Sequence, residues 1–392
     1  MLTSTKADHL RYAIKASSEE LAQSLIDTNA RTRSLLQALT PEQLRVPQLP
    51  LLNPPHWEFG HVNWFHDYWI HRLGQASRPS LLGGVDAVFN SSLIANQSRW
   101  TAPVPPLEVL LAQNEQLMQK TLTQLDALPA QPHSESDRAF SYFVQLAILH
   151  QDMHNEAFAM MWHYLGYPEP FSPFVVSPPR VDSQTWMTPT YLEFVTNTIT
   201  LGSNSEEGFL FDNEKWAHPV TVPAFAIASH AVTNAQYLKF VNAVNDSTVI
   251  PQHWRCEAGT WSVRDFDRWQ MMAENAPVSH INYADAQRYC AWKGERLPTE
   301  AELSVLMVQN EQAWQVSDLW EWTSSSFAPF AGFSPDPYED YSQPWFDGSY
   351  RVLKGWSRFT TPRMRRPAMR NFYQTQRADP FCGFRTCLVN PN

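Results

Sequence analysis

The sequence predicts an α+β protein in which a four-helix bundle, residues 1–170, precedes a domain of short strands and irregular loops, residues 171–392. Long stretches of helical periodicity fill the first part, where apolar residues recur three or four positions apart. After residue 167 the composition turns to proline-rich segments and short β-like runs, which are typical of strands and turns. The length of 392 residues is also sufficient for two domains.

Composition limits the classes of protein to which the chain can belong. Its formal net charge of −10 argues against a nucleic-acid partner, for which a basic surface is expected. The chain has no apolar run of the roughly 18 residues that a membrane span needs, and its polar N-terminus lacks the apolar core of a signal peptide. The four cysteines show neither CxxC zinc spacing nor the pattern of a disulfide framework. We therefore expect a cytoplasmic protein with no membrane partner.

Four segments of the first part are predicted to be long helices. Their ranges are 17–39, 54–74, 106–128 and 136–166. Ser17 and Glu20 form a capping box, and Ser136 can cap the last of these helices. The segment 75–105 is rich in Ser, Pro, Gly and Asn, and is predicted to be a long crossover loop.

The second part contains few segments with regular periodicity. β-like runs occur at 220–222, 225–227 and 351–353. Helices are predicted only at 234–244 and 283–293. The long loops that carry Trp and Arg favour a binding surface.

Three histidines on two of the predicted helices indicate a candidate metal site. His150 and His154 lie one turn apart on the apolar stripe of the last helix. His61 lies on the apolar stripe of the second helix. Three imidazoles that point into a bundle can bind a metal, and core histidines bonded to backbone or water are the alternative. The remaining histidines of the second helix, which are predicted to face solvent, are His56, His66 and His71.

Several motifs together resemble a known family. In the second part they are HPVTVPAFAIASHAVTNAQYLKFV, GERLPTEAEL, LWEWTSS, RVLKGWS and GFRTC. They look like the formylglycine-generating-enzyme (sulfatase-modifying-factor) fold, which resembles a C-type lectin. The first part, with its H-x3-H-x-E pattern ending at Glu156, looks like a DinB-type bundle. In this order the two domains resemble the ergothioneine sulfoxide synthases and the related selenoneine synthases.

The resemblance implies that His61, His150 and His154 hold ferrous iron, Fe(II). Protein ligands on one side of the ion leave positions open for oxygen and substrate, as in non-heme iron oxygenases. Zinc also binds three histidines. A zinc-dependent thiol transferase of the DinB kind therefore remains an alternative, and a non-catalytic lectin-like binding protein is a third.

The family's reaction joins a sulfur or selenium donor to C2 of the imidazole of hercynine, the trimethylated betaine of histidine, with molecular oxygen as the oxidant. Its Y-x-x-Y pattern matches Tyr338 and Tyr341. The resemblance implies that Tyr338 is catalytic and supplies a proton and an electron, and that Tyr341 contacts hercynine. Aromatic packing is the alternative for such a pair in a Pro-rich loop.

The segment RNFYQTQR matches the family's substrate-binding strip. The resemblance places Asn371 on the betaine carboxylate and Phe372 against the trimethylammonium, which an aromatic face attracts. Arg377 and the bundle-side Arg99 match arginines that bind the donor's carboxylate, a pairing that a planar guanidinium makes in two bonds. A surface arginine is the alternative for Arg99.

Two positions depart from the enzymes that use γ-glutamylcysteine. Tyr373 stands where those enzymes have an acidic residue, and Met153 stands where they commonly have Gln. A tyrosine hydroxyl is uncharged at neutral pH and leaves a donor's ammonium unpaired. We therefore predict a selenoneine synthase with a selenosugar donor, 1-seleno-glucose. An ergothioneine sulfoxide synthase using cysteine or γ-glutamylcysteine is the close alternative. No cysteine lies between Cys290 and Cys382, which argues against sulfatase activation.

Overall fold

The structure is a computed structural model that describes residues 16–129, 134–174, 189–203, 209–309, 314 and 316–389. The chain forms two compact units, each assembled from separate pieces of the sequence. Unit 1 comprises Met1–Met161, Asn204–Phe211 and Ser334–Tyr341. Unit 2 comprises Trp162–Ser203, Asp212–Phe333 and Ser342–Asn392.

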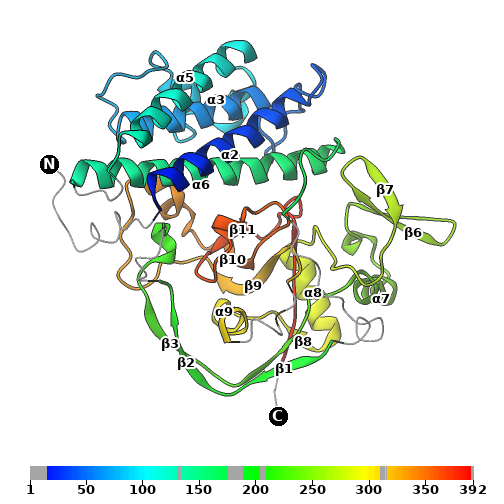
Figure 1. The fold of residues 1–392 in the computed structure, drawn as a ribbon. Coiled ribbons are helices and arrows are strands. Elements are labelled where there is room, and N and C mark those ends of the chain that lie inside the picture. The colour runs from blue at the N-terminus through cyan, green and yellow to red at the C-terminus, as the bar shows by residue number, and fades with distance from the viewer. Residues whose placement is uncertain are drawn as a thin grey trace. The chain divides into compact units, whose positions relative to one another are not determined.

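Unit 1 is built on four helices that lie side by side (Figure 1). They are α2 (Ser18–Gln37), α3 (Pro55–His66), α5 (Leu107–Asp126) and α6 (Glu135–Leu165), the last of which runs on into unit 2 after Met161. A π-helix, η1 (Asp67–His71), extends α3, and the following connection contains α4 (Asp86–Phe89) and η2 (Asn96–Trp100). The four predicted helices and the long connection are therefore confirmed.

The helix ends show which local signals were correct. The capping box of α2 is present, since the backbone N–H of Glu20 donates to Ser17 Oγ at 3.2 Å and the Glu20 carboxylate accepts from the Ser17 N–H. The prediction of Ser136 as the cap of α6 is wrong. Ser134 has this role, because its Oγ accepts from the backbone N–H of Asp137 at 3.1 Å. The S-x-x-D spacing from Ser134 fits a cap better than Ser136 does.

Helix α3 is buried around almost its whole circumference. Only His56 among its residues is partly exposed, and His66 is 1% exposed. The prediction that His66 meets solvent is therefore wrong. The face of α3 that carries Gly60 is packed as well. A Cβ at Gly60 would lie 2.1 Å from the ring of Phe89 on α4, so this close approach needs glycine. A helix packed on all sides has no solvent face to predict.

Unit 2 contains two four-stranded sheets, one three-stranded sheet and one two-stranded sheet among its described residues (Figure 1). The strand orders are β1-β4-β13-β8, β11-β10-β9-β12, β5-β6-β7 and β2-β3. The strands are β1 (Tyr191–Phe194), β2 (Asn197–Leu201), β3 (His218–Val222), β4 (Phe225–Ala228), β5 (Trp254–Glu257), β6 (Thr260–Asp265), β7 (Arg268–Met271), β8 (Glu295–Arg296), β9 (Trp320–Ser326), β10 (Tyr350–Gly355), β11 (Asn371–Gln374), β12 (Cys382–Gly383) and β13 (Cys387–Leu388). The three predicted β-like runs lie in β3, β4 and β10.

Three α-helices lie among these strands in the described part of unit 2. Helices α7 (Asn234–Val244) and α8 (Tyr283–Lys293) are confirmed with their predicted bounds. The prediction that unit 2 has no other helix is wrong, because α9 (Glu300–Gln309) follows β8. Most of its side chains are buried on every face, so its sequence lacks a polar stripe. Its start carries a local signal, a capping box: Thr299 Oγ1 accepts from the backbone N–H of Glu302, and the Glu302 carboxylate accepts from the Thr299 N–H.

Two buried ion pairs involve charged residues of the unit 2 motifs. Arg385 of the GFRTC motif is 0% exposed and donates two bonds to the carboxylate of Glu321 in LWEWTSS. Arg370 likewise donates to both carboxylate oxygens of Glu300 in GERLPTEAEL, at 2.7 and 3.1 Å. Each pair neutralises two charges that would otherwise be buried alone, so the loss of one partner would be costly.

Two further features agree with the composition. Cys256, Cys290, Cys382 and Cys387 are free thiols. Among the described helices, none combines the length and the apolar character that crossing a bilayer requires.

Candidate metal centre

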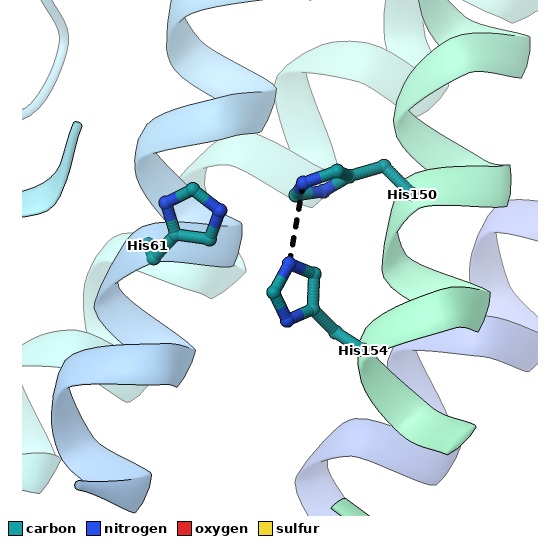
Figure 2. Close-up of side chains that lie close together, drawn as sticks. All are labelled: His61, His150 and His154. Carbon is teal, nitrogen blue, oxygen red and sulfur yellow. Dashed lines mark hydrogen bonds between the residues drawn. The ribbon is translucent and has the colours of Figure 1, made fainter. Parts of the chain in front are cut away.

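Three imidazole rings from two helices converge in unit 1. His61 lies on α3, and His150 and His154 lie one turn apart on α6 (Figure 2). The ring centroids are 5.2 Å apart for His61 and His150, 5.0 Å for His61 and His154, and 4.4 Å for His150 and His154. One nitrogen of each ring lies within 4.8 Å of the other two. The structure thus brings together the three histidines on the two apolar stripes.

The hydrogen-bond partners of the rings show which nitrogens are free. Nδ1 of His61 lies 2.7 Å from the carbonyl oxygen of Phe89, and Nδ1 of His154 lies 2.8 Å from Oε1 of Glu58. A carbonyl and a carboxylate only accept, so each Nδ1 carries the proton and each Nε2 keeps its lone pair. The Nε2 atoms of His154 and His150 lie 3.2 Å apart. An acceptor behind the ring, as at His61 and His154, is typical of metal-ligating histidines; among the described residues, Nδ1 of His150 has no such acceptor.

Burial keeps His61 and His150 in the neutral form. Each is 3% exposed, and burial lowers the pKa of both well below the ordinary histidine value, with His154 adding to the effect. Stacked aromatic rings hold them in place: Trp57 lies 5.3 Å from His61, and Phe65 lies 3.5 Å from His150, between ring centroids. Neutral, fixed imidazoles can bind a divalent transition metal such as iron or zinc.

Glu58 is the site residue that the sequence reasoning missed. It is 3% exposed and precedes His61 by three positions on α3, yet its carboxylate bonds to His154 on the other helix. A carboxylate behind a ligating histidine fixes the ring orientation and raises the basicity of the ligand. The available signal was an acidic residue one turn before a histidine in a helix of otherwise apolar character.

The segment Ser334–Tyr341 brings the Y-x-x-Y pair into unit 1. The ring of Tyr338 lies 5.9 Å from that of His150, nearly perpendicular to it, and 5.0 Å from that of Phe65. Burial raises the pKa of Tyr338, so its hydroxyl stays protonated at neutral pH. Tyr341 stacks on Phe211 at 4.0 Å, and its ring centroid lies 6.2 Å from that of Tyr338. Tyr338 is therefore the tyrosine next to the histidines.

Arg99 lies behind the ring that packs on His61. Its guanidinium carbon is 4.1 Å from the ring centroid of Trp57, and Nη1 donates to Oδ1 of Asn53 at 2.7 Å. Burial lowers the pKa of Arg99. Among the described residues, no carboxylate forms an ion pair with this guanidinium. A partly buried cation without a counter-ion is suited to an anionic ligand.

The other predicted site residues lie in unit 2. They are Asn371, Phe372 and Tyr373 on β11, and Arg377 just after it. Phe372 stacks on Phe327 with the ring centroids 3.9 Å apart. The guanidinium of Arg377 is bonded to both carboxylate oxygens of Asp379 and lies 5.5 Å from the ring centroid of Tyr373. The charge of Arg377 is therefore already balanced within unit 2.

Unit 1 is helical and holds a three-histidine centre. Unit 2 is rich in strands and carries the motifs of the sulfatase-modifying-factor fold. Together they define a class of two-domain metal enzyme. Comparison with family models agrees with this class. The sulfatase-modifying factor enzyme 1-like domain matches residues 194–318 and 314–389, which together span half of the chain. The DinB superfamily matches residues 24–157. These matches confirm the predicted fold class.

Curated relatives extend this similarity over nearly the whole chain. The hercynine oxygenase of Mycolicibacterium thermoresistibile is 28% identical over 433 residues, covering 93% of this chain and 94% of the relative. That of Mycolicibacterium smegmatis is 27% identical, covering 94% and 98%. A formylglycine-generating enzyme of Mycobacterium tuberculosis is 32% identical over only 24% of this chain and 44% of the relative. The chain belongs to the hercynine oxygenase family, which joins a DinB domain to a sulfatase-modifying-factor domain.

Proposed function

We propose that this chain is an oxygen-dependent non-heme iron(II) enzyme that joins a thiol donor to C2 of the imidazole of hercynine. The observation that carries the proposal is the convergence of His61, His150 and His154, with the ring of Tyr338 beside His150. The full-length similarity to two hercynine oxygenases supports hercynine, a thiol and oxygen as substrates. Iron(II), when bound, supplies the activation of oxygen at the positions that three histidines leave open.

The residues around the histidines have separate tasks in this proposal. Glu58 and the carbonyl of Phe89 keep the protons on Nδ1 of His154 and His61, which leaves both Nε2 lone pairs for the ion. Tyr338 holds a proton on its phenolic oxygen, because burial raises its pKa. Its position beside His150 supports a role as the proton donor during bond formation. Phe65 and Trp69 pack edge-on against that ring, at 5.0 and 5.7 Å between centroids, and hold it in place.

The proposed substrate contacts follow the family resemblance. Asn371 would bind the carboxylate of hercynine, and Phe372 would offer an aromatic face to its trimethylammonium group. Tyr341, fixed by stacking on Phe211, would contact hercynine as well. Arg99 would bind a carboxylate of the thiol donor, because it is the site arginine that lacks an ion-pair partner among the described residues.

A selenosugar is the second candidate donor, and two observations in unit 2 favour it. Tyr373 is uncharged, so it cannot pair with the ammonium of γ-glutamylcysteine. Arg377 already has Asp379 as its counter-ion, so a donor's carboxylate would have to displace that residue. The unpaired Arg99 and the curated relatives favour the thiol instead. The two donors therefore need a direct comparison.

A competition assay compares the donors. Hercynine, iron and oxygen are supplied with cysteine, γ-glutamylcysteine, 1-thioglucose and 1-seleno-glucose together, and the products are separated by mass. Coupling of cysteine or γ-glutamylcysteine at least as efficiently as the selenosugar supports the sulfoxide synthase. Preferential formation of a carbon–selenium bond supports a selenoneine synthase. No oxygen-dependent product from any donor would overturn both.

Metal analysis of anaerobically purified protein tests the iron centre. Iron bound in unit 1 and oxygen uptake that depends on hercynine are expected. His154→Ala should remove most of this iron and all turnover while the protein stays folded. His56→Ala, on the same helix as His61 but outside the cluster, is the control and should keep both. Zinc with oxygen-independent thiol transfer would instead support the DinB-type transferase.

A further inference from the structure

A second group of three histidines lies in unit 2. His163 is near the end of α6, His253 immediately precedes β5, and His280 lies shortly before α8. One nitrogen of each ring is within 4.8 Å of the other two, and the ring centroids are 4.5, 4.2 and 4.7 Å apart. The three residues are 2%, 4% and 4% exposed. The cluster is thus as compact as the one in unit 1, and the proposed reaction does not use it.

All three imidazoles are neutral. Burial, the largest cause, lowers the pKa of His163 and of His253 to about 2, and it lowers that of His280 well below the ordinary value. Arg264 and Arg358 lower the pKa of His163 further, because a cation disfavours a nearby imidazolium. A neutral imidazole has one nitrogen with a lone pair, which is the form that binds a metal.

One ring of the cluster has a buried nitrogen without a hydrogen-bond partner among the described residues. Nδ1 of His280 lies 3.2 Å from the carbonyl oxygen of Ala378, so Nδ1 carries the proton and Nε2 keeps a lone pair. In the described part of the chain, Nδ1 of His163 is buried and has no hydrogen-bond partner, and its Nε2 lies 3.7 Å from Asp265 Oδ1, beyond hydrogen-bond range. A buried nitrogen without a partner is costly, and a metal ion at this point would remove that cost.

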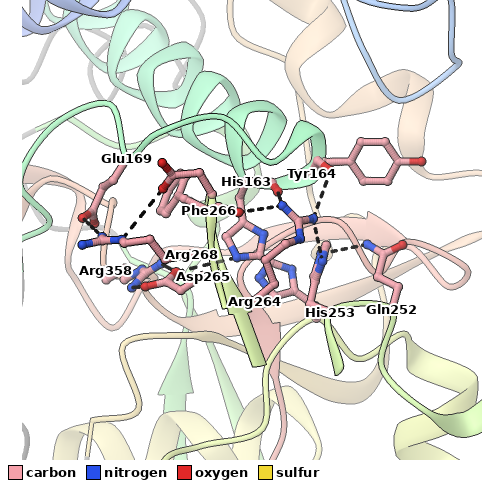
Figure 3. Close-up of polar contacts among 12 residues, drawn as sticks. His163, Tyr164, Glu169, Gln252, His253, Arg264, Asp265, Phe266, Arg268 and Arg358 are labelled. Carbon is pink, nitrogen blue, oxygen red and sulfur yellow. Dashed lines mark hydrogen bonds and ion pairs between the residues drawn. The ribbon is translucent and has the colours of Figure 1, made fainter. Parts of the chain in front are cut away.

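The third ring, that of His253, accepts a hydrogen bond from an arginine that also has other acceptors. Arg264 Nη2 lies 2.9 Å from Nδ1 of His253, and the Gln252 side-chain amide lies 3.0 Å from Nε2 (Figure 3). Arg264 also donates to the backbone carbonyls of His163, Tyr164 and Phe266. If His253 bound a metal ion through Nδ1, the Arg264 guanidinium would lose one acceptor and would still donate to these three carbonyl oxygens.

A cavity of about 270 Å³ adjoins the cluster. Its lining includes His163 and His280, together with the side chains of Arg264, Asp265 and Arg358. Arg358 is paired with Asp265 (Figure 3). A site with three protein ligands and adjacent open space can take an exchangeable fourth ligand. The two arginines favour a small anion, such as hydroxide or a carboxylate, at that position.

We propose that His163, His253 and His280 form a second metal site, which binds a divalent transition-metal ion such as Zn²⁺ and holds its fourth ligand in the adjoining cavity. Three neutral imidazoles suit zinc, copper, nickel and iron. Zinc–nitrogen bonds are about 2.0–2.1 Å long, so the stacked rings of His163 and His280 must turn for their nitrogens to meet at one ion. The ion joins three segments that are far apart in the sequence. It stabilises the native state, because the unfolded chain does not hold the ligands together.

The first test isolates this site from the one in unit 1. A full-length His61→Ala/His154→Ala variant is stripped of metal and titrated with Co²⁺ alone, then with Zn²⁺ alone. We expect one ion per chain, with the visible absorption of imidazole-bound Co²⁺. X-ray absorption of the zinc form should show three imidazoles as ligands. A folded variant that binds neither ion would overturn the proposal without affecting the iron centre.

The second test removes the ligands singly in that background. His253→Gln keeps an acceptor for Arg264, and His280→Gln keeps a polar group near Ala378; each should abolish the Co²⁺ absorption. His230→Gln replaces a buried histidine of unit 2 outside the cluster and should retain it. In that background, Zn²⁺ should raise the Tm of the parent variant and of His230→Gln, but not that of the ligand variants. Unchanged Co²⁺ binding in both ligand variants would show that the ion is held elsewhere.

Discussion

The carboxylate of Glu58 on α3 lies 2.8 Å from Nδ1 of His154 on α6, although the two residues are 96 positions apart. This bond keeps the proton of His154 on Nδ1 and directs Nε2 toward the two other imidazoles. The carbonyl of Phe89 has the same effect on His61. The ligand geometry of unit 1 therefore depends on residues that do not themselves bind the metal.

Glu58→Gln should lower the affinity for ferrous iron by about 10- to 100-fold, the usual effect of losing a carboxylate behind a ligating histidine. The amide oxygen of Gln can still accept from Nδ1, but its charge is gone. Iron titration under anaerobic conditions measures the change. Glu108→Gln, at an exposed position of α5, is the matched control. Equal iron affinity in the wild type and Glu58→Gln would rule out this role.

Tyr338→Phe should lower kcat by about 10²- to 10⁴-fold, the range expected when a proton donor is removed. The phenyl ring keeps the packing on Phe65 and His150, so the iron content should not change. Tyr341→Phe is the comparison, and it should mainly raise the KM for hercynine. Single-turnover kinetics separate the two effects. Wild-type coupling rates in Tyr338→Phe would contradict the assignment.

His66 should make the stability of the protein depend on pH. Burial lowers its pKa from 6.5 to about 4, so between these values the unfolded chain binds a proton that the native state does not. Its contribution is full above pH 6.5 and falls as the pH drops toward 4, by up to about 3 kcal/mol. Urea unfolding of the metal-free wild type and His66→Asn across this range measures the difference. Parallel pH profiles for the two proteins would show that His66 is not responsible.

Arg385→Met should destabilise unit 2 by about 3–5 kcal/mol, because it leaves the buried carboxylate of Glu321 without a partner. Adding Glu321→Met should restore part of the loss, since no buried charge then remains. The exposed pair of Arg288 and Asp246 is the control, and Arg288→Met should cost no more than about 1 kcal/mol. Chemical denaturation of each variant gives the free energies of unfolding. A small cost for Arg385→Met alone would refute the argument.

Most helices could be predicted because their signals are local. Thr233 and Asn282 cap α7 and α8 by accepting hydrogen bonds from backbone N–H groups a few residues later. Helix α9 was missed because it is buried on nearly all faces, so it has no polar stripe to mark its period. For the same physical reason, the prediction that His66 faces solvent was wrong. Whether the polar face of a helix is buried depends on which element packs against it, and the spacing of apolar residues along the helix cannot show that.

By itself, the sequence determined the inward stripes that carry His61, His150 and His154, because spacing along a helix depends only on the backbone. Only the tertiary structure decided that Glu58 bonds to His154 and that Tyr338 lies beside His150. These contacts join residues far apart in the chain. They form when helices and loops pack, and local sequence signals do not specify which distant side chains then meet.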